Sequence, residues 1–126
     1  MSSKRILLID DDIDDVEIFV EAIHALDKEV QCQTELNPAK ALEELSGSDK
    51  LPDVILIDYN MPMINGLEFL QRLKNIRQSA EIDVVVMSTP PKEVMIPWLH
   101  NNNAFVKYIA KPTSFEELKI ALDSIL

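Results

Sequence analysis

The chain has 126 residues, 47% of them hydrophobic, which is enough for one domain with a buried core and argues against a disordered protein. Its 22 acidic residues outnumber the 12 basic ones, and a net charge of −10 argues against nucleic acid or an anionic membrane surface as a direct partner. Its single cysteine, Cys32, cannot form an internal disulfide, and no stretch is typical of a signal peptide or a membrane span, so a cytoplasmic protein is expected.

The first predicted strand covers roughly Lys4–Asp10, an apolar run that ends on the consecutive acids Asp10, Asp11 and Asp12. A helix is predicted to follow, because apolar residues recur at helical spacing; they are Ile13, Val16, Val20, Ile23 and Leu26. Its first turn is acidic, which suits the positive end of the helix dipole; the residues are Asp14, Asp15 and Glu17.

The second predicted strand, roughly Glu29–Leu36, alternates apolar and polar residues, a pattern typical of a half-exposed edge strand. Asn37 and Pro38 then form an N-cap with proline at the first helical position. The apolar face of this second helix consists of Ala41, Leu42 and Leu45, and the helix ends at Ser46-Gly47-Ser48.

The third predicted strand is the β-branched run Val54–Ile57, which suits a strand buried on both faces and which stops on Asp58. A cluster of turn formers follows it, namely Asn60, Pro62, Asn65 and Gly66. A third helix is predicted to begin near Asn65-Gly66, with its apolar stripe formed by Leu67, Leu70 and Leu73.

A fourth strand, Asp83–Met87, is followed by Thr89-Pro90-Pro91 and by a fourth helix whose course is the hardest to predict. Pro97 lies among its apolar residues, and an interior proline costs about 3 kcal/mol. We therefore expect this helix to be short, to start close to Pro97, or to be distorted there.

The fifth predicted strand is Phe105–Ile109, and Lys111-Pro112 comes shortly after it. The last helix begins after Pro112, with Ser114 or Thr113 as N-cap and Glu117 able to complete a capping box from Ser114. Its core face consists of Leu118, Ala121, Leu122 and Ile125.

This alternation of five strands with five helices, joined by short connections, predicts one domain over residues 1–126, a doubly wound α/β fold with a parallel sheet and no effector domain. The carboxyl ends of parallel strands share one edge of the sheet, where ligands bind. Asp58 and the acids Asp10, Asp11 and Asp12 are thus expected to bring at least three carboxylates to this edge. Carboxylates at such close range need a cation such as Mg²⁺ among them. Lys111 is expected to bring a fixed positive charge to the same edge.

The chain resembles the receiver domains of response regulators, the CheY-like proteins, over about Lys4–Leu126. Five features in the right order carry the resemblance: Asp10-Asp11, Asp58, Asn60 with Met61-Pro62 and Gly66, Ser88, and Lys111-Pro112. The resemblance implies a three-layer, flavodoxin-like sheet with strand order 2-1-3-4-5.

The resemblance also implies roles for the residues at this edge. Asp58 corresponds to the phosphoryl acceptor, Asp11 to a direct Mg²⁺ ligand, Asp10 to a direct or water-mediated one, and Asn60 to a ligand through its backbone carbonyl. Lys111 and the Ser88 hydroxyl correspond to the groups that contact phosphoryl oxygens in the family, and Tyr108 matches the family's aromatic switch position. The output face would lie on the fourth helix, fifth strand and fifth helix, and would include Met95, Trp98, Lys107 and Tyr108.

Three departures from the family pattern stand out: Ser88 replaces the commoner threonine, Thr113 stands where phenylalanine is frequent, and Pro90 occupies a position that tunes hydrolysis of the acyl phosphate. Proline offers no side-chain hydrogen bond to an attacking water, and with Pro91 and Pro97 nearby the switch loop is expected to be stiffer than usual. We therefore expect a slower switch or a shifted pre-equilibrium. Unchanged phosphorylation and hydrolysis rates in Pro90→Glu would contradict this expectation.

Other interpretations of the acidic stretch carry less weight. Asp10, Asp12, Asp14 and Glu21 match four positions of a calcium loop, but Asp15 stands where that loop needs glycine. Asp10-x-Asp12 is also similar to the nucleophile motif of aspartyl-phosphate hydrolases, which are usually longer. His24, His100 and Cys32 lack partners at ligand spacing and are expected to be structural or solvated.

The resemblance thus predicts a stand-alone phosphoacceptor switch and not an enzyme with a separate substrate. Its phosphate would come from a histidine kinase or a histidine phosphotransfer protein, and its output would be protein–protein contact as a monomer or a phosphorylation-dependent dimer. The alternatives are a small Mg²⁺-dependent aspartyl-phosphate phosphohydrolase and a degenerate receiver kept only for binding.

Overall fold

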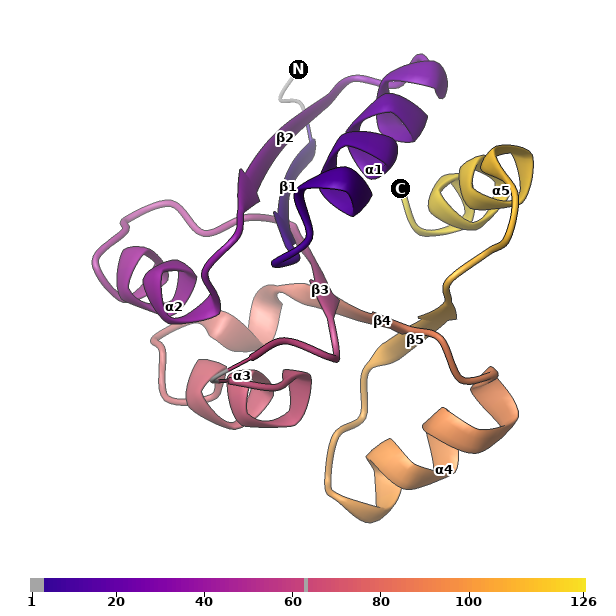
Figure 1. Cartoon of the computed structure of the whole chain (residues 1–126). Coiled ribbons are helices and arrows are strands. Elements are labelled where there is room, and N and C mark those ends of the chain that lie inside the picture. The colour runs from indigo at the N-terminus through magenta and orange to yellow at the C-terminus, as the bar shows by residue number, and fades with distance from the viewer. Residues whose placement is uncertain (1–3, 63) are drawn as a thin grey trace.

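The computed structural model, which describes residues 4–62 and 64–126, has one parallel sheet with strand order β2-β1-β3-β4-β5 and helices on both faces (Figure 1). The strands are β1 (Lys4–Ile9), β2 (Val30–Glu35), β3 (Val54–Asp58), β4 (Asp83–Ser88) and β5 (Lys107–Ala110). The helices are α1 (Ile13–Ala25), α2 (Pro38–Ser46), α3 (Gly66–Leu73), α4 (Lys92–Asn101), α5 (Phe115–Ile125) and a short 3-10 helix, η1 (Ser79–Glu81). The doubly wound fold and its strand order are confirmed.

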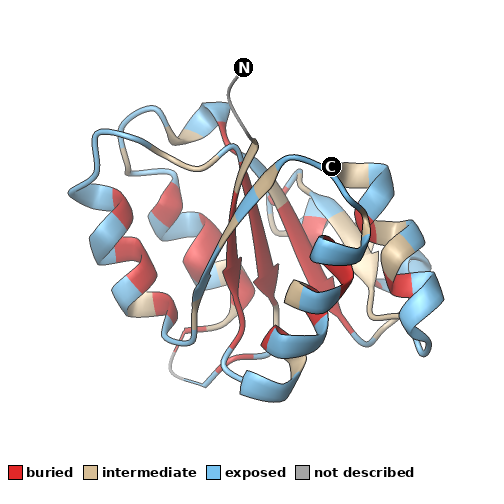
Figure 2. Ribbon diagram, turned by 90° about the horizontal axis from the view of Figure 1, so that it is seen from above, coloured by how far each residue is buried: buried red, intermediate tan, exposed pale blue. Residues whose placement is uncertain are grey.

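The sheet separates two hydrophobic cores (Figure 2). Val54 and Leu56 of β3 point into the core beneath α1 and α5, whereas Ile55 and Ile57 point into the core beneath α2, α3 and α4. All four are almost completely buried, as predicted for a strand covered on both faces. Strand β2, at the edge, alternates half-buried and exposed residues over most of its length, which also agrees with its pattern.

The register of the strands brings their carboxyl ends to one edge. Ile9 pairs with Ile57, Asp58 with Met87, and Ser88 with Ala110. Each strand therefore ends at nearly the same height, and the residues that follow must meet there. Within residues 4–62 and 64–126, no helix combines the length and the apolar character needed to cross a bilayer.

Several of the helices begin with a residue whose side chain caps the first turn. Asn37 and Ser114 accept hydrogen bonds from the first turns of α2 and α5, so Ser114 rather than Thr113 is the cap of the last helix. Asn65 caps α3 in the same way. Asp12 caps α1 by accepting from the backbone amides of Asp14 and Asp15, a role that the sequence analysis did not assign to it.

Helix α4 differs from one expectation, since it begins at Lys92 and contains Pro97 instead of starting beside it. Met95 and Leu99 anchor the helix in the core, while Pro97 is exposed. The carbonyl left without an amide partner by the proline is that of exposed Glu93, where water can replace the lost hydrogen bond. Burial of one face therefore outweighs the local penalty of proline.

A further expectation is wrong in detail. Strand β5 begins at Lys107, not at Phe105, because the Ala104 amide still bonds to the Leu99 carbonyl at the end of α4 and Phe105 is 73% exposed. Ile13, counted among the apolar residues at helical spacing, does not share their burial: it is the first residue of α1 and is 57% exposed.

Gly66, the first residue of α3, is required by a close approach to Tyr59. A Cβ at Gly66 would lie 2.8 Å from Cδ2 and 3.0 Å from Cα of Tyr59, closer than carbon atoms pack. The Gly66 amide also donates to the Tyr59 carbonyl at 2.9 Å. Because Gly66 has no side chain, the start of α3 can pack closely against the loop that follows Asp58.

Replacing Gly66 by alanine should lower the free energy of unfolding by about 1–3 kcal/mol, because the added methyl group must push the Tyr59 backbone away. The matched control is Gly47→Ala, where the nearest neighbour of the new Cβ is the Glu43 carbonyl at 3.8 Å. The control should be neutral or slightly stabilising. Urea denaturation of both variants checks this, and equal midpoints would contradict the packing argument.

Candidate functional site

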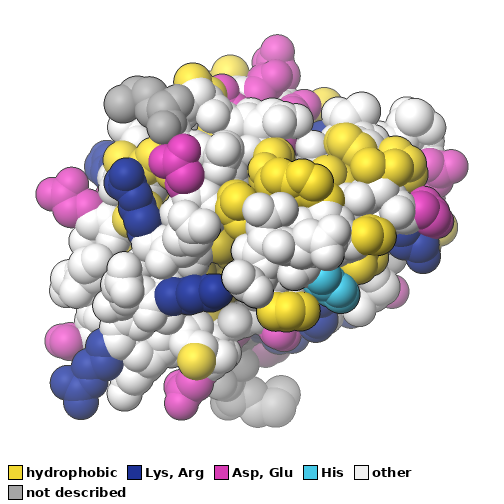
Figure 3. Space-filling model, turned by 90° about the horizontal axis from the view of Figure 1, so that it is seen from below, with side chains coloured by type: hydrophobic (Ala, Val, Ile, Leu, Met, Phe, Trp, Pro, Cys, Tyr) yellow, Lys and Arg dark blue, Asp and Glu magenta, His cyan; other side chains and the backbone are white. Residues whose placement is uncertain are grey.

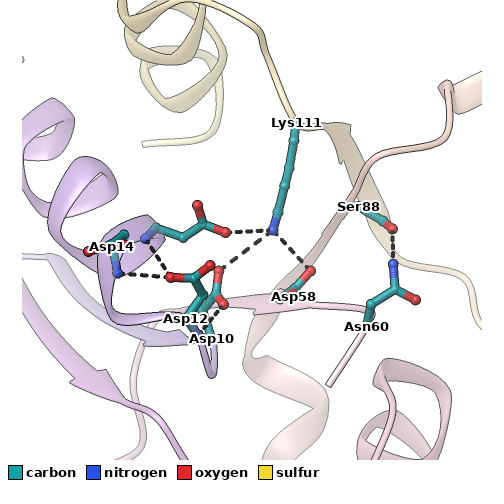
Figure 4. A network of polar contacts seen from close by, with 8 residues as sticks. Asp10, Asp12, Asp14, Asp58, Asn60, Ser88 and Lys111 are labelled. Atoms are coloured by element: carbon teal, nitrogen blue, oxygen red, sulfur yellow. Dashed lines mark hydrogen bonds and ion pairs between the residues drawn. The ribbon is translucent and has the colours of Figure 1, made fainter. Parts of the chain in front are cut away.

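Three aspartates meet at the carboxyl edge of the sheet. Two of them, Asp10 and Asp58, are seen beside Lys111 in Figure 4. Asp10 follows β1 and is completely buried, Asp58 ends β3 and is 5% exposed, and Asp11 is exposed beside them. One carboxylate oxygen from each lies within 4.8 Å of the others. The predicted acidic set is therefore assembled.

Lys111, which follows β5, extends its side chain into this set. Its Nζ lies 3.3 Å from Oδ1 of Asp58 and 3.7 Å from Oδ2 of Asp10. Its shortest contact is to neither of these: it donates a hydrogen bond to Oδ2 of Asp15, on the first turn of α1, at 3.1 Å. From the sequence, Asp15 was expected on this turn only as an acid that suits the helix dipole.

The ionisation of these groups reflects burial and mutual charge. Burial, aided by the negative charges of Asp58 and Asp15, raises the pKa of Asp10 to about 6, against the hydrogen bond from the Asp12 amide and the charge of Lys111. Burial likewise raises the pKa of Asp58, although Lys111 opposes it. Burial would lower the pKa of Lys111, but the hydrogen bond to Asp15 and the surrounding carboxylates outweigh it, so the pKa is raised.

The donor set fits a hard divalent cation. Oδ1 of Asp10 accepts from the Asp12 amide at 3.0 Å, whereas the buried Oδ2 accepts no hydrogen bond from any residue that the structure describes. A buried carboxylate oxygen without a donor is stabilised by a metal ion, and carboxylate oxygens are the ligands that Mg²⁺ prefers. Asp10, Asp11 and Asp58 are thus suited to hold such an ion.

Ser88 and Asn60 lie on the other side of Asp58. Ser88 ends β4, is 1% exposed, and its Oγ accepts a hydrogen bond from Nδ2 of Asn60 at 3.1 Å. From the sequence, only the backbone carbonyl of Asn60 was expected to matter, and its role as a metal ligand stays a prediction. The amide side chain instead holds the Ser88 hydroxyl, a contact that the strand pattern could not reveal.

Tyr108 and Tyr59 connect this edge to the loop after β4 and to α4. The half-buried Tyr108 donates from its hydroxyl to the carbonyl of Pro90, and burial raises its pKa. Tyr59, directly after Asp58, packs edge-on against Trp98 of α4 with ring centroids 5.5 Å apart. Met95, expected on the exposed face of this helix, is buried, which corrects that expectation.

The alternative sites suggested by single residues are not assembled. Asp10 follows a strand, not a helix, and Asp12 caps α1, so a helix–loop–helix calcium site is absent at this position. His24 is exposed on α1, and His100 is exposed and packs against Phe105 with ring centroids 5.0 Å apart. Cys32 is half-buried in the edge strand and forms no disulfide.

Comparisons with known proteins agree with the geometry. The family model described as the response regulator receiver domain matches residues 6–123. The chain is 29% identical over 119 residues to the probable C4-dicarboxylate response regulator DctR of Bacillus subtilis, which covers 94% of this chain and 50% of DctR. It is 32% identical over 79 residues to the probable methanogenesis regulatory protein FilR2 of Methanothrix harundinacea, covering 63% of this chain and 50% of FilR2. The chain thus spans about half the length of these relatives.

Solved structures show the same architecture. The chemotaxis response regulator CheY4 of Vibrio cholerae, 20% identical, superposes with a TM-score of 0.79 over 99% of this chain and 100% of CheY4. The phosphorylated cyanobacterial phytochrome response regulator RcpA, 26% identical, gives a TM-score of 0.82 over 98% of this chain and 91% of RcpA. These likenesses agree on the fold, and the family match over residues 6–123 shows that the chain belongs to the receiver domains of two-component response regulators.

Proposed function

We propose that Asp58 is the phosphoryl acceptor of this receiver domain, with phosphate supplied by a histidine kinase or a histidine phosphotransfer protein. The proposal rests on the position of the ammonium group of Lys111, which lies 3.3 Å from Oδ1 of Asp58. The carboxylates of Asp10 and Asp11 lie beside that of Asp58. An anionic nucleophile and an anionic phosphoryl group are brought together only where fixed positive charge stands between them. Lys111 supplies one positive charge at this site, and a cation held by the three carboxylates would supply the rest.

Asp10, Asp11 and Asp58 would hold Mg²⁺, with the backbone carbonyl of Asn60 as a further ligand. When bound, the ion neutralises charge between the carboxylate and the incoming phosphoryl group. An oxygen of Asp58 then forms a bond to phosphorus while the bond from phosphorus to the donor's imidazole nitrogen breaks. The electron pair of that bond stays with the nitrogen, and Lys111 pairs with a phosphoryl oxygen as a point charge.

The hydroxyl of Ser88 is the second group that would meet the phosphoryl oxygens. Its Oγ accepts a hydrogen bond from Asn60, so its own proton stays available to donate to a phosphoryl oxygen. Tyr108 donates a hydrogen bond to the carbonyl of Pro90, in the loop that follows Ser88. Movement of Ser88 would therefore be transmitted to Tyr108 and α4, and the expected influence of Pro90 on the rate of this switch stays a prediction.

The expected output face, formed by α4, β5 and α5, has apolar side chains available for a protein partner. Val94 and Trp98 of α4 are 58% and 40% exposed, and Ile120 of α5 is 70% exposed. The underside of the molecule, where α4 lies in Figure 1, carries a band of hydrophobic side chains (Figure 3). We propose that downstream proteins dock here, and that the chain acts as a monomer or as a dimer formed on phosphorylation.

A small Mg²⁺-dependent phosphohydrolase is not favoured, because the receiver-domain match extends over residues 6–123. The two functions differ in stoichiometry. A receiver stops near one phosphate per chain and then hydrolyses it slowly, whereas a hydrolase turns over many molecules of a small phosphate ester.

Incubation with acetyl phosphate and Mg²⁺ should add one phosphate to the wild-type chain and none to Asp58→Asn, as measured by intact mass spectrometry. Asp83→Asn, at the amino end of β4 and the opposite edge of the sheet, is the matched control and should be phosphorylated normally. Chelation of Mg²⁺ should abolish the gain. Phosphorylation that survives in Asp58→Asn would contradict the assignment of the acceptor.

Mg²⁺ affinity should fall as the pH drops below about 6, because the ion binds the ionised carboxylate of Asp10 and a proton competes for it once the pH is below its pKa. A single competing proton weakens binding by up to about tenfold per pH unit. Above pH 7 the affinity should level off.

Isothermal titration calorimetry between pH 5 and 8 measures this dependence. Asp10→Asn should bind Mg²⁺ weakly at every pH and lose the inflection near pH 6. An unchanged affinity of the wild type from pH 5 to pH 8 would show that the protonation of Asp10 is not linked to metal binding.

A further inference from the structure

Asp15 is the carboxylate closest to the ammonium group of Lys111. The distance of 3.1 Å from Nζ of Lys111 to Oδ2 of Asp15 is shorter than the distances of 3.3 Å to Asp58 and 3.7 Å to Asp10, and Lys111 donates a hydrogen bond to Asp15. The side chains of Lys111 and Asp15 are 24% and 36% exposed, so the pair is partly shielded from water. The turn that carries Asp15 is fixed in place by the cap of Asp12.

Asp15 is also separate from the three carboxylates that converge. Among the described residues, Asp10, Asp11 and Asp58 are the group of three or more carboxylates with oxygens within 4.8 Å of one another, and Asp15 is not a member of it. A divalent ion held by these three would share the carboxylates of Asp10 and Asp58 that Lys111 now faces, and it would repel the ammonium group. Asp15 is the remaining neighbour that can keep Lys111 paired.

We propose that Asp15 is a positioning residue: it is the counter-ion that holds Lys111 at the site when a divalent cation occupies Asp10, Asp11 and Asp58. The inference deepens the proposed function and rests on it in assigning Lys111 to the phosphoryl group. It has two consequences. Asp15 reduces the competition of Lys111 with the metal, and it keeps the ammonium group within reach of an oxygen on phosphorylated Asp58.

The competing explanation is an ordinary surface ion pair, which has little effect on stability and acts on the metal only as one more negative charge. The two explanations differ in their dependence on Lys111. A general charge effect is the same whether or not Lys111 is present, whereas a positioning effect disappears when Lys111 is removed.

The first test is the rate of phosphorylation by acetyl phosphate at saturating Mg²⁺. Asp15→Asn should be slowed by roughly threefold to tenfold, the effect expected for one partly exposed charged hydrogen bond. Asp14→Asn is the matched control, because it removes the same charge from an exposed neighbour on the same turn. It should retain the wild-type rate, and Asp15→Glu should recover most of it.

The second test is Mg²⁺ affinity, measured by calorimetry in a double-mutant cycle with Lys111→Met. Asp15→Asn should weaken binding more than Asp14→Asn does when Lys111 is present, and no more than Asp14→Asn does in the Lys111→Met background. An equal effect of Asp15→Asn in both backgrounds, or a phosphorylation rate equal to that of Asp14→Asn, would overturn the proposal.

These tests separate the inference from the proposed function. A wild-type chain that takes up no phosphate from acetyl phosphate would count against the proposed function, while the cycle on Mg²⁺ affinity would still decide whether Asp15 positions Lys111. If the wild-type chain is phosphorylated on Asp58 but Asp15→Asn behaves like Asp14→Asn, the proposed function is retained and the positioning role of Asp15 is rejected.

Discussion

Asp10 and Asp58 are buried side by side because the register of β1 and β3 ends both strands at the same edge of the sheet. Two buried carboxylates at this range repel each other, and burial alone already disfavours their charged forms. Lys111 offsets part of this repulsion, yet the pKa of Asp10 remains raised to about 6. The fold thus holds a charge arrangement that is unfavourable for stability and suited to capturing a cation, an exchange of stability for function that active sites often show.

The surroundings of Asp58 connect this charge arrangement to the outer helices. Asn60 holds the Ser88 hydroxyl, and Tyr59 contacts Trp98 of α4. The residues directly after Asp58 therefore contact both the end of β4 and the helix that follows it. If Asp58 is phosphorylated as proposed, a phosphoryl group that draws Ser88 toward it would act on the loop that leads to α4.

Much of the fold was predictable because strong patterns encode it: buried runs for β1, β3 and β4, helical spacing for the helices, and the fixed meeting point of parallel strands for the acidic set. The contacts that were missed depend on side-chain direction, which spacing does not determine. Asp15 looked like any acid in a first helical turn, and the Asn60 side chain had no pattern of its own. The course of α4 was uncertain because burial of Met95 and Leu99 competes with the penalty of Pro97, and only tertiary packing decides between them.

The buried acidic set should destabilise the fold until a cation binds, and thermal unfolding of Asp10→Asn at pH 7.5 measures this effect. A carboxyl whose pKa is raised by folding destabilises the fold increasingly from about pH 4 to pH 6 and fully above that range. In a chelator, Asp10→Asn should therefore unfold about 4 °C or more above the wild type, and Mg²⁺ should raise the midpoint of the wild type but hardly that of the variant. A lower midpoint for Asp10→Asn in the chelator, or an equal response of both chains to Mg²⁺, would contradict the account.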